Sequence, residues 1–189
     1  MLKVTHRSAL ALALLAATVL CFAPLTMAGD GETPGTLSFK ASNKMYAADG
    51  KFEKWGFTKV DIPDGNLEKG TAEFEVDLAS VWEKTEALAD HLRQADFFHV
   101  AKFTTATVKI HGVKKTGDNS YDATATVDFH GFTNDVPVQF KVVGESPLKI
   151  EGTATMQRTA FGIGGEYDPS NERSITDDVN ISLSATLPN

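Results

Sequence analysis

The feature that most constrains the fold of this chain is a regular alternation of apolar and polar residues along most of its length. In "TAEFEVDLASV", Ala72, Phe74, Val76 and Leu78 alternate with acidic residues. Successive side chains of a β-strand point to opposite faces, so this pattern is typical of a strand with one buried and one solvated face.

The same alternation recurs in six further segments, and a less regular strand is expected over residues 52–62. The six are 36–42, 106–110, 121–129, 136–142, 148–156 and 179–187. Strands buried on both faces would show continuous apolar runs, so the sheet is predicted to be antiparallel. Hairpin-length connections favour a meander over a sandwich. The predicted fold class is all-β: one antiparallel up-and-down eight-stranded β-barrel, with one short helix closing an end.

The single convincing helix pattern lies between two of these strands. Ser80 and Glu83 match a capping box, and Leu88, Leu92 and Ala95 follow at the spacing of one apolar stripe. Phe97 and Phe98 come directly afterwards. Adjacent helical residues point about 100° apart, yet both rings are expected to be buried. They either form the end wall of a pocket or merely fix the helix to the sheet.

The first residues have the three-part layout of an export signal. Lys3 and Arg7 precede an apolar run that ends in "TMA", and no stop-transfer pattern follows. Cleavage is predicted near Ala28, with a periplasmic or secreted product that is not stably inserted in a membrane. The predicted organisation is a signal peptide over 1–28, a flexible linker over 29–35 and one domain over 36–189.

The composition of the mature chain excludes some classes of partner. The only cysteine, Cys21, lies in the signal segment, so no disulfide is expected. Loss of Lys3 and Arg7 leaves 16 basic and 25 acidic residues, a formal net charge of −9. Such a charge argues against nucleic acid and against anionic lipid surfaces as partners.

Several predicted inward positions carry alanine. An eight-stranded barrel is just wide enough to be filled by side chains or to hold one small ligand. The alanines either leave volume for a ligand or interlock with opposing rings, and the sequence leaves both outcomes open. These positions are Ala72, Ala106, Ala123, Ala125, Ala154 and Ala185.

Motifs for catalysis or metal binding do not emerge. The mature histidines lack the spacing of zinc ligands, and the acidic residues lie mainly on outward faces. No catalytic residue, metal site or cofactor is predicted. Arg158 has two interpretations: an outward arginine paired with a carboxylate, or an arginine near the barrel mouth that contacts a lipid head group.

Four stretches resemble one known family. They are "EFEVDLASV", "HLRQADFFHVAKFTTATVKI", "YDATATVDFHGFTNDVPVQFKV" and "MQRTAFGIG". In order and spacing they resemble the YceI-like family of secreted lipid-binding proteins. The chain departs from the family pattern at Thr36–Ser38, at Asn134 and Asp135, and at Ala160. The resemblance implies a lipocalin-like barrel whose apolar interior holds a long isoprenoid or fatty-acyl chain, without catalytic residues.

The sequence thus predicts a non-enzymatic binding protein for a polyisoprenoid, isoprenoid quinone or fatty-acyl lipid, held non-covalently for transport, storage or sequestration. The alternatives are a lipocalin-like enzyme acting on an apolar substrate and a filled barrel that serves as an interaction module. Homodimer formation stays open. The candidate ligand-contacting residues are Phe39, Phe74, Val76, Leu88, Leu92, Phe97, Phe98, Val108, Ile110, Val127, Phe129, Phe140, Met156, Arg158 and Phe161.

Overall fold

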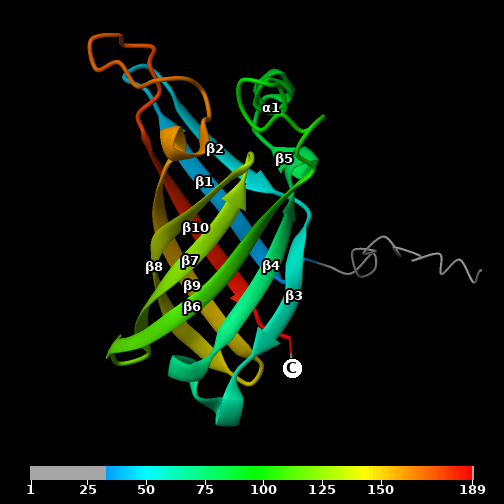
Figure 1. Ribbon diagram of the computed structural model, residues 1–189, viewed down its shortest axis with the longest axis vertical. Helices are drawn as coiled ribbons and strands as arrows, with labels where there is room; N and C mark the ends of the chain where they lie inside the picture. The colour runs from blue at the N-terminus through cyan, green and yellow to red at the C-terminus, as the bar shows by residue number, and fades with distance from the viewer. Residues whose placement is uncertain (1–32, 189) are drawn as a thin grey trace, which may run out of the picture. The chain divides into compact units, whose positions relative to one another are not determined.

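A computed structural model describes residues 33–188. The predicted signal segment and most of the predicted linker therefore lie outside the described residues. The described part forms one curled antiparallel sheet of ten strands (Figure 1). The strands are β1 (Gly35–Ser42), β2 (Ala47–Phe52), β3 (Trp55–Asp61), β4 (Thr71–Asp77), β5 (Val81–Trp82), β6 (Thr105–Gly117), β7 (Ser120–Phe129), β8 (Phe132–Glu145), β9 (Leu148–Gln157) and β10 (Asp178–Thr186).

The strand order in the sheet is β3-β4-β6-β7-β8-β9-β10-β1-β2-β5. Strands β6 to β10 form a meander, and β10 then pairs with β1 through registers such as Gly35 with Ala185. The predicted all-β antiparallel class is confirmed, but the predicted count of eight strands is wrong by two. Strand β2 lacks the apolar alternation, and β5 has only two residues, so neither has a clear sequence pattern.

A sharp bend joins the two ends of this sheet. Strand β2 pairs with β1, while β3, which is separated from β2 by only two residues, pairs with β4. The bend is held by the turn over 77–80. Glu53 N donates to Ser80 O at 3.1 Å, and Lys54 N donates to Ser80 Oγ at 3.0 Å. The chain itself therefore connects the first strand of the sheet order to the ninth.

The helix α1 (Glu86–Leu92) is shorter than predicted and starts later. The predicted capping box does not form, because the Ser80 hydroxyl donates to Asp77 O in the 77–80 turn and Thr85 occupies the N-cap. Ala89 and Leu92 are buried, while Ala95, beyond the end of the helix, is exposed. No helix within residues 33–188 combines the length and apolar character that a membrane span requires.

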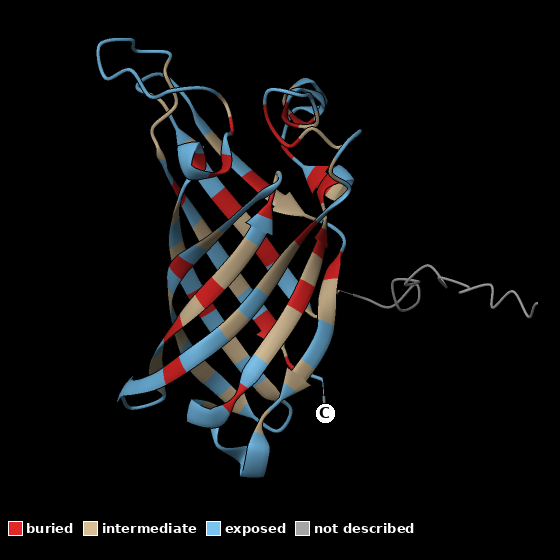
Figure 2. Cartoon of the chain, viewed as in Figure 1, coloured by how far each residue is buried: buried red, intermediate tan, exposed pale blue. Residues whose placement is uncertain are grey.

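Burial follows the alternation that the sequence shows. Along the strands, buried positions alternate with exposed ones (Figure 2). Phe74 and Val76 on β4 are buried, and the acidic residues beside them are more exposed. Burying a side chain of this size contributes about 1.5–3 kcal/mol. The apolar faces of all the long strands thus point into one shared interior.

Candidate ligand-binding site

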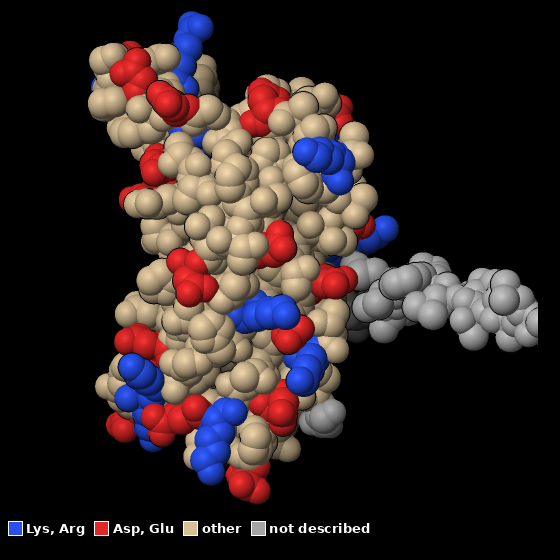
Figure 3. All heavy atoms as spheres, in the orientation of Figure 1, with Lys and Arg blue, Asp and Glu red and all other residues tan. Residues whose placement is uncertain are grey.

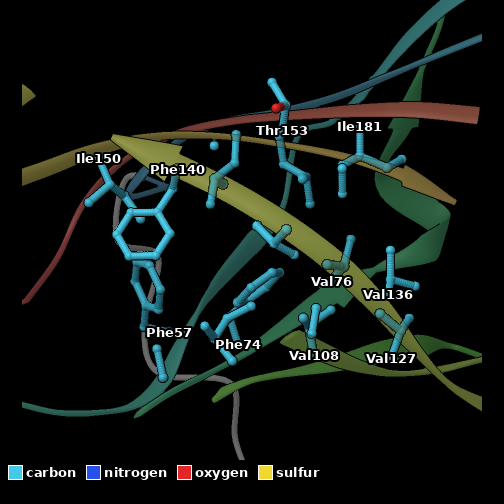
Figure 4. A pocket seen from close by; sticks show the side chains of 18 of the residues that line it. Phe57, Phe74, Val76, Val108, Val127, Val136, Phe140, Ile150, Thr153 and Ile181 are labelled. Carbon is cyan, nitrogen blue, oxygen red and sulfur yellow. The ribbon is translucent and has the colours of Figure 1, made fainter. Parts of the chain in front are cut away.

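The interior of the curled sheet is not completely filled. It holds a cavity of about 200 Å³ whose wall is built from inward side chains of most of the strands (Figure 4). No charged residue lines this cavity, and Ser38, Thr71 and Thr153 are the lining residues with hydroxyl groups. Four of the six predicted inward alanines, Ala72, Ala106, Ala125 and Ala154, lie in the wall. Of the two outcomes that the sequence left open, the structure therefore shows an interior with free volume rather than a filled one.

Aromatic rings form much of the wall. The Phe57 and Phe74 rings meet edge to face, with their centroids 5.9 Å apart. The Trp55 ring packs behind both, at 5.8 and 5.7 Å. Phe57, Phe74 and Phe140 project into the same space in Figure 4. These contacts hold the rings in fixed positions around the cavity.

Phe39 reaches across the neighbouring strand because that strand has a glycine there. Gly50 on β2 is paired with Phe39, and a Cβ atom at Gly50 would lie only 2.1 Å from Phe39 Cζ. Any larger residue would force this ring, which lines the cavity, out of its position. Gly50 therefore keeps that part of the cavity open.

The curled sheet has two ends, here called the helix end and the connection end. The helix end carries α1, the β7–β8 turn and the long β9–β10 connection. The connection end carries the 62–70 connection between β3 and β4, with its short 3₁₀ turns η1 (Pro63–Gly65) and η2 (Leu67–Lys69). Figure 1 shows the two ends at opposite extremes of the curled sheet.

At the helix end, a second layer of rings lies beyond the cavity wall. The Phe98 ring is 5.5 Å from Phe129, 5.7 Å from Phe52 and 6.2 Å from Phe39, and all three partners line the cavity. Phe97 packs against the His91 ring at 4.7 Å. Both phenylalanines are buried, with 9% and 7% of their surfaces exposed, so the prediction that both rings are buried is confirmed.

Arg158 holds the β9–β10 connection in place, and the first of its two interpretations, an outward arginine paired with a carboxylate, is wrong. Strand β9 ends at Gln157, and the 3₁₀ turn η4 (Arg158–Phe161) redirects the side chain, which is only 2% exposed. Its guanidinium donates to the carbonyls of Thr176 at 3.0 Å, Ile175 at 2.7 Å, Ile163 at 2.6 Å, and Gly165. Burial lowers the pKa of Arg158, and the charge of Asp177 partly offsets this.

Other side chains add to this network at the helix end. His130 Nδ1 donates to Phe161 O at 3.0 Å, which places the proton of a neutral imidazole on Nδ1. Asn134 Nδ2 donates to Ala160 O at 3.0 Å. Arg93 donates to the carbonyls of Val81 and Ala79, and its hydrogen bond to Glu86 raises the pKa of the Arg93 guanidinium. The helix end is thus fixed by several side-chain hydrogen bonds to backbone.

The connection end is built differently. Ile62 and Leu67 line the cavity from the 62–70 connection, and both are half-exposed. Among side chains of the described residues, only Glu68 ties this connection to another strand, accepting from Lys115 N at 3.1 Å. Figure 3 shows charged side chains gathered around this end. They include the exposed Asp61, Asp64, Glu68, Lys69, Lys114, Lys115, Asp118, Lys141, Glu145 and Lys149.

The candidate residues divide into two groups. Nine line the cavity: Phe39, Phe74, Val76, Val108, Ile110, Val127, Phe129, Phe140 and Met156. The other six lie outside its lining: Leu88, Leu92, Phe97, Phe98, Arg158 and Phe161. All of these except Leu88 are buried at the helix end. Contact of any of the fifteen with a ligand stays a prediction.

Sequence reasoning missed lining residues in and beside β3. Phe57 and Val60 both line the cavity although they are three residues apart, because the pairing register shifts between Phe57 and Lys59. Ile62 and Leu67 belong to a connection that carries no strand pattern. The apolar side chains in a stretch of turn-forming residues, "IPDGNL", were the only signal that pointed to them.

Residues 33–188 contain no group of three or more His, Cys, Asp or Glu side chains placed to hold a metal ion. The histidine pair nearest to such an arrangement, His99 and His130, has ring centroids 6.3 Å apart and lies at the helix end, outside the cavity lining. The recognisable features of the site are therefore its shape and its apolar wall.

The chain is similar in sequence to curated relatives and in fold to solved structures. A protein of the UPF0312 group from Pseudomonas fluorescens is 31% identical over 157 residues, covering 78% of each chain. The crystal structure of BcnA from Burkholderia cenocepacia aligns with a TM-score of 0.72 at 20% identity, covering 82% of this chain and 96% of that one. A polyisoprenoid binding domain from Saccharophagus degradans, described as implicated in plant cell wall breakdown, aligns with a TM-score of 0.56 at 20% identity, covering 83% and 96%.

The family model of the YceI-like domain matches residues 32–187. This range includes all ten strands, the helix and every residue that lines the cavity. The resemblance of the four quoted stretches is thereby confirmed, and the chain belongs to the YceI-like family.

Proposed function

We propose that this protein binds one long apolar chain inside its curled sheet. The observation that carries the proposal is the cavity wall, which contains no charged residue. Each methylene group that moves from water into such a wall contributes about 0.8 kcal/mol. A chain of many such groups can therefore bind tightly without a polar contact, whereas a small polar molecule gains little.

The ligand class that fits best is a polyisoprenoid, an isoprenoid quinone or a fatty-acyl lipid. Support comes from the family and from the Saccharophagus degradans domain, which is described as polyisoprenoid binding. We infer further that the sheet acts as a closed up-and-down barrel around the chain, because the bend at Glu53 and Lys54 joins its two ends. The ligand is held non-covalently and without a cofactor.

A binding role is favoured over an enzymatic one. A lipid-modifying enzyme would need a titratable group facing its substrate, and the cavity lining offers none with a charge. We propose that the protein acts in the periplasm or outside the cell, after cleavage near Ala28, to transport, store or sequester its ligand. Neither nucleic acid nor a metal ion has a part in this role, and homodimer formation is compatible with it.

Native mass spectrometry of the protein purified from its own compartment tests this proposal. We expect an adduct with the mass of a single-chain lipid, which organic extraction releases unchanged. The same spectrum gives the mature N-terminus, expected at Gly29, and the oligomeric state. Release of a chemically altered lipid during incubation would favour the enzyme alternative. A protein that never carries lipid and takes up no cis-parinaric acid would contradict the proposal.

A further inference from the structure

The two ends of the cavity differ in how their lining is buried. Toward the helix end, the wall includes the buried residues Phe39, Val76, Leu78 and Phe129, beside the half-exposed Phe52, Val127 and Met156. Toward the connection end, several lining residues are half-exposed. These are Val60, Ile62, Leu67 and Ile150. The cavity therefore approaches solvent at the connection end and stops against packed rings at the helix end.

The connections that cover the two ends also differ in how they are held. The 158–177 segment at the helix end is tied to other elements by side-chain bonds from His130 and Asn134 and by two backbone bonds, Gly164 N to Asp96 O at 2.7 Å and Thr176 N to Ser42 O at 2.8 Å. Four hydrogen bonds from Arg158 hold the segment together internally. The 62–70 connection forms hydrogen bonds mainly within itself, such as Gly70 N to Leu67 O. Displacing it breaks one side-chain bond to β6, that of Glu68.

The charges around the connection end complete the contrast. Five lysines and five acidic residues are exposed there, and within the described part of the chain none of these ten side chains forms an ion pair. A polar or anionic head group cannot enter the uncharged cavity without losing its hydration. At this rim it stays in water, among exposed charged side chains of both signs.

From these three observations we propose that the ligand enters tail first through the connection end, past a gate formed by the 62–70 connection. The end of its apolar chain lies against the ring layer of Phe98, and its polar head stays in water at the charged rim of the connection end. The ligand class is thereby narrowed to single-chain amphiphiles with a polar head. This inference rests on the proposed function and deepens it.

The direction of a bound chain can be measured with the protein's own tryptophan. The chain contains two tryptophans, Trp55 and Trp82. Trp82 is 43% exposed on the outside, so Trp82→Phe leaves Trp55 as the sole emitter. Trp55 packs on Phe57 and Phe74 at the bend. Strand β3 runs from there to Asp61, about 20 Å away at 3.3 Å per residue.

Stearic acids brominated at different carbons serve as probes, because bromine quenches tryptophan only at short range. If the tail lies toward the helix end, bromine near the methyl terminus quenches Trp55 most and bromine near the carboxylate quenches it least. The reverse order, or equal quenching by every isomer, would overturn the inference while leaving the proposed function intact. If native mass spectrometry shows that none of the acids binds, the proposed function fails with it.

The gate is tested by a matched pair of variants. Glu68→Ala removes the one side-chain bond that holds the 62–70 connection to β6, and Asn134→Ala removes one side-chain bond at the helix end. The dissociation rate of cis-parinaric acid is measured by stopped flow. We expect Glu68→Ala to raise it about threefold to tenfold, the effect of one hydrogen bond, and Asn134→Ala to leave it unchanged. Faster release in Asn134→Ala alone, or in neither variant, would overturn the gate.

Discussion

The helix end and the connection end of the sheet are covered in opposite ways. At the helix end, buried rings and buried hydrogen-bond donors close the interior, and the Arg158 guanidinium satisfies four backbone carbonyls. At the connection end, short 3₁₀ turns with half-exposed apolar residues lie over the cavity. One end is thus built for stability and the other for exchange. A curled sheet can combine a stable end with an end that exchanges ligand, because different segments of the chain cover the two ends.

The largest expected effect comes from removing the arginine of the helix end. Arg158→Met deprives four carbonyls of their donor, and each buried polar group left unsatisfied costs about 1–3 kcal/mol. We expect the free energy of unfolding to fall by about 4–6 kcal/mol, allowing for partial rehydration. Chemical denaturation measures this loss. The control is Arg173→Met, an exposed arginine in the same connection, which should change stability by less than about 0.5 kcal/mol. If both variants lost a similar free energy of unfolding, the proposal that Arg158 stabilises the helix end would be contradicted.

The ring layer at the helix end gives the next prediction. Phe98→Ala should cost about 3–5 kcal/mol, the usual loss for a buried phenylalanine. It should also lengthen the cavity, because Phe98 backs three lining rings. We expect the preferred chain length in a fatty-acid series to increase.

Phe97→Ala is the matched comparison for this layer, since Phe97 touches His91 rather than the cavity wall. It should cost less stability and leave the preferred chain length unchanged. An unchanged length preference in both variants would mean that the ligand does not reach the helix end.

Filling the cavity from its wall has a smaller effect on stability. Ala125→Phe with Ala154→Phe should abolish binding of cis-parinaric acid, because both side chains line the cavity. Overpacking costs about 1–3 kcal/mol per site. Thr155→Phe, the outward neighbour of Ala154, is the control and should bind normally. Binding that survives the double substitution would place the ligand elsewhere.

The smallest expected effect concerns pH at the helix end. Hydrogen bonds from the side chain and backbone of Ser170 lower the pKa of Asp168 below its ordinary value of 3.8. A lowered folded-state pKa means that the stabilisation is complete above pH 3.8 and is lost as the pH falls below it. The difference in melting temperature between the protein and Asp168→Asn should therefore be present at pH 6 and vanish in strong acid. A constant difference across this range would contradict the assignment.

The alternation in the sequence was sufficient to predict the wall of the cavity but not its ends. Phe74, Val108 and Phe140 lie where period-two spacing places them, because strand geometry fixes the direction of each side chain. Arg158 could not be placed in this way, since a 3₁₀ turn interrupts the strand pattern at that residue. Leu67 sits in a connection, where side-chain direction depends on contacts that are distant in sequence. Both ends of the molecule are formed by such irregular segments.

The register shift in β3 shows a second limit of sequence reasoning. Phe57 and Val60 share the interior only because a bulge separates them, and a strict period of two would place them on opposite faces. The paired phenylalanines were predictable for a different reason. Phe97 and Phe98 follow a short helix, and the turn after it re-aims one ring, so both can be buried.

The pairing of β1 with β10 affects the order in which the chain can fold. Gly35 pairs with Ala185, so the first strand gains its second partner, beside β2, only when nearly the whole chain is available. The bend between β2 and β3 likewise brings together opposite ends of the strand order. Contacts between such distant residues slow folding, because loop-closure entropy is lost before they form. A chain emerging from its N-terminus therefore keeps one edge of β1 unpaired until synthesis is almost complete. A partner that masks this edge during that interval would protect the protein from aggregation.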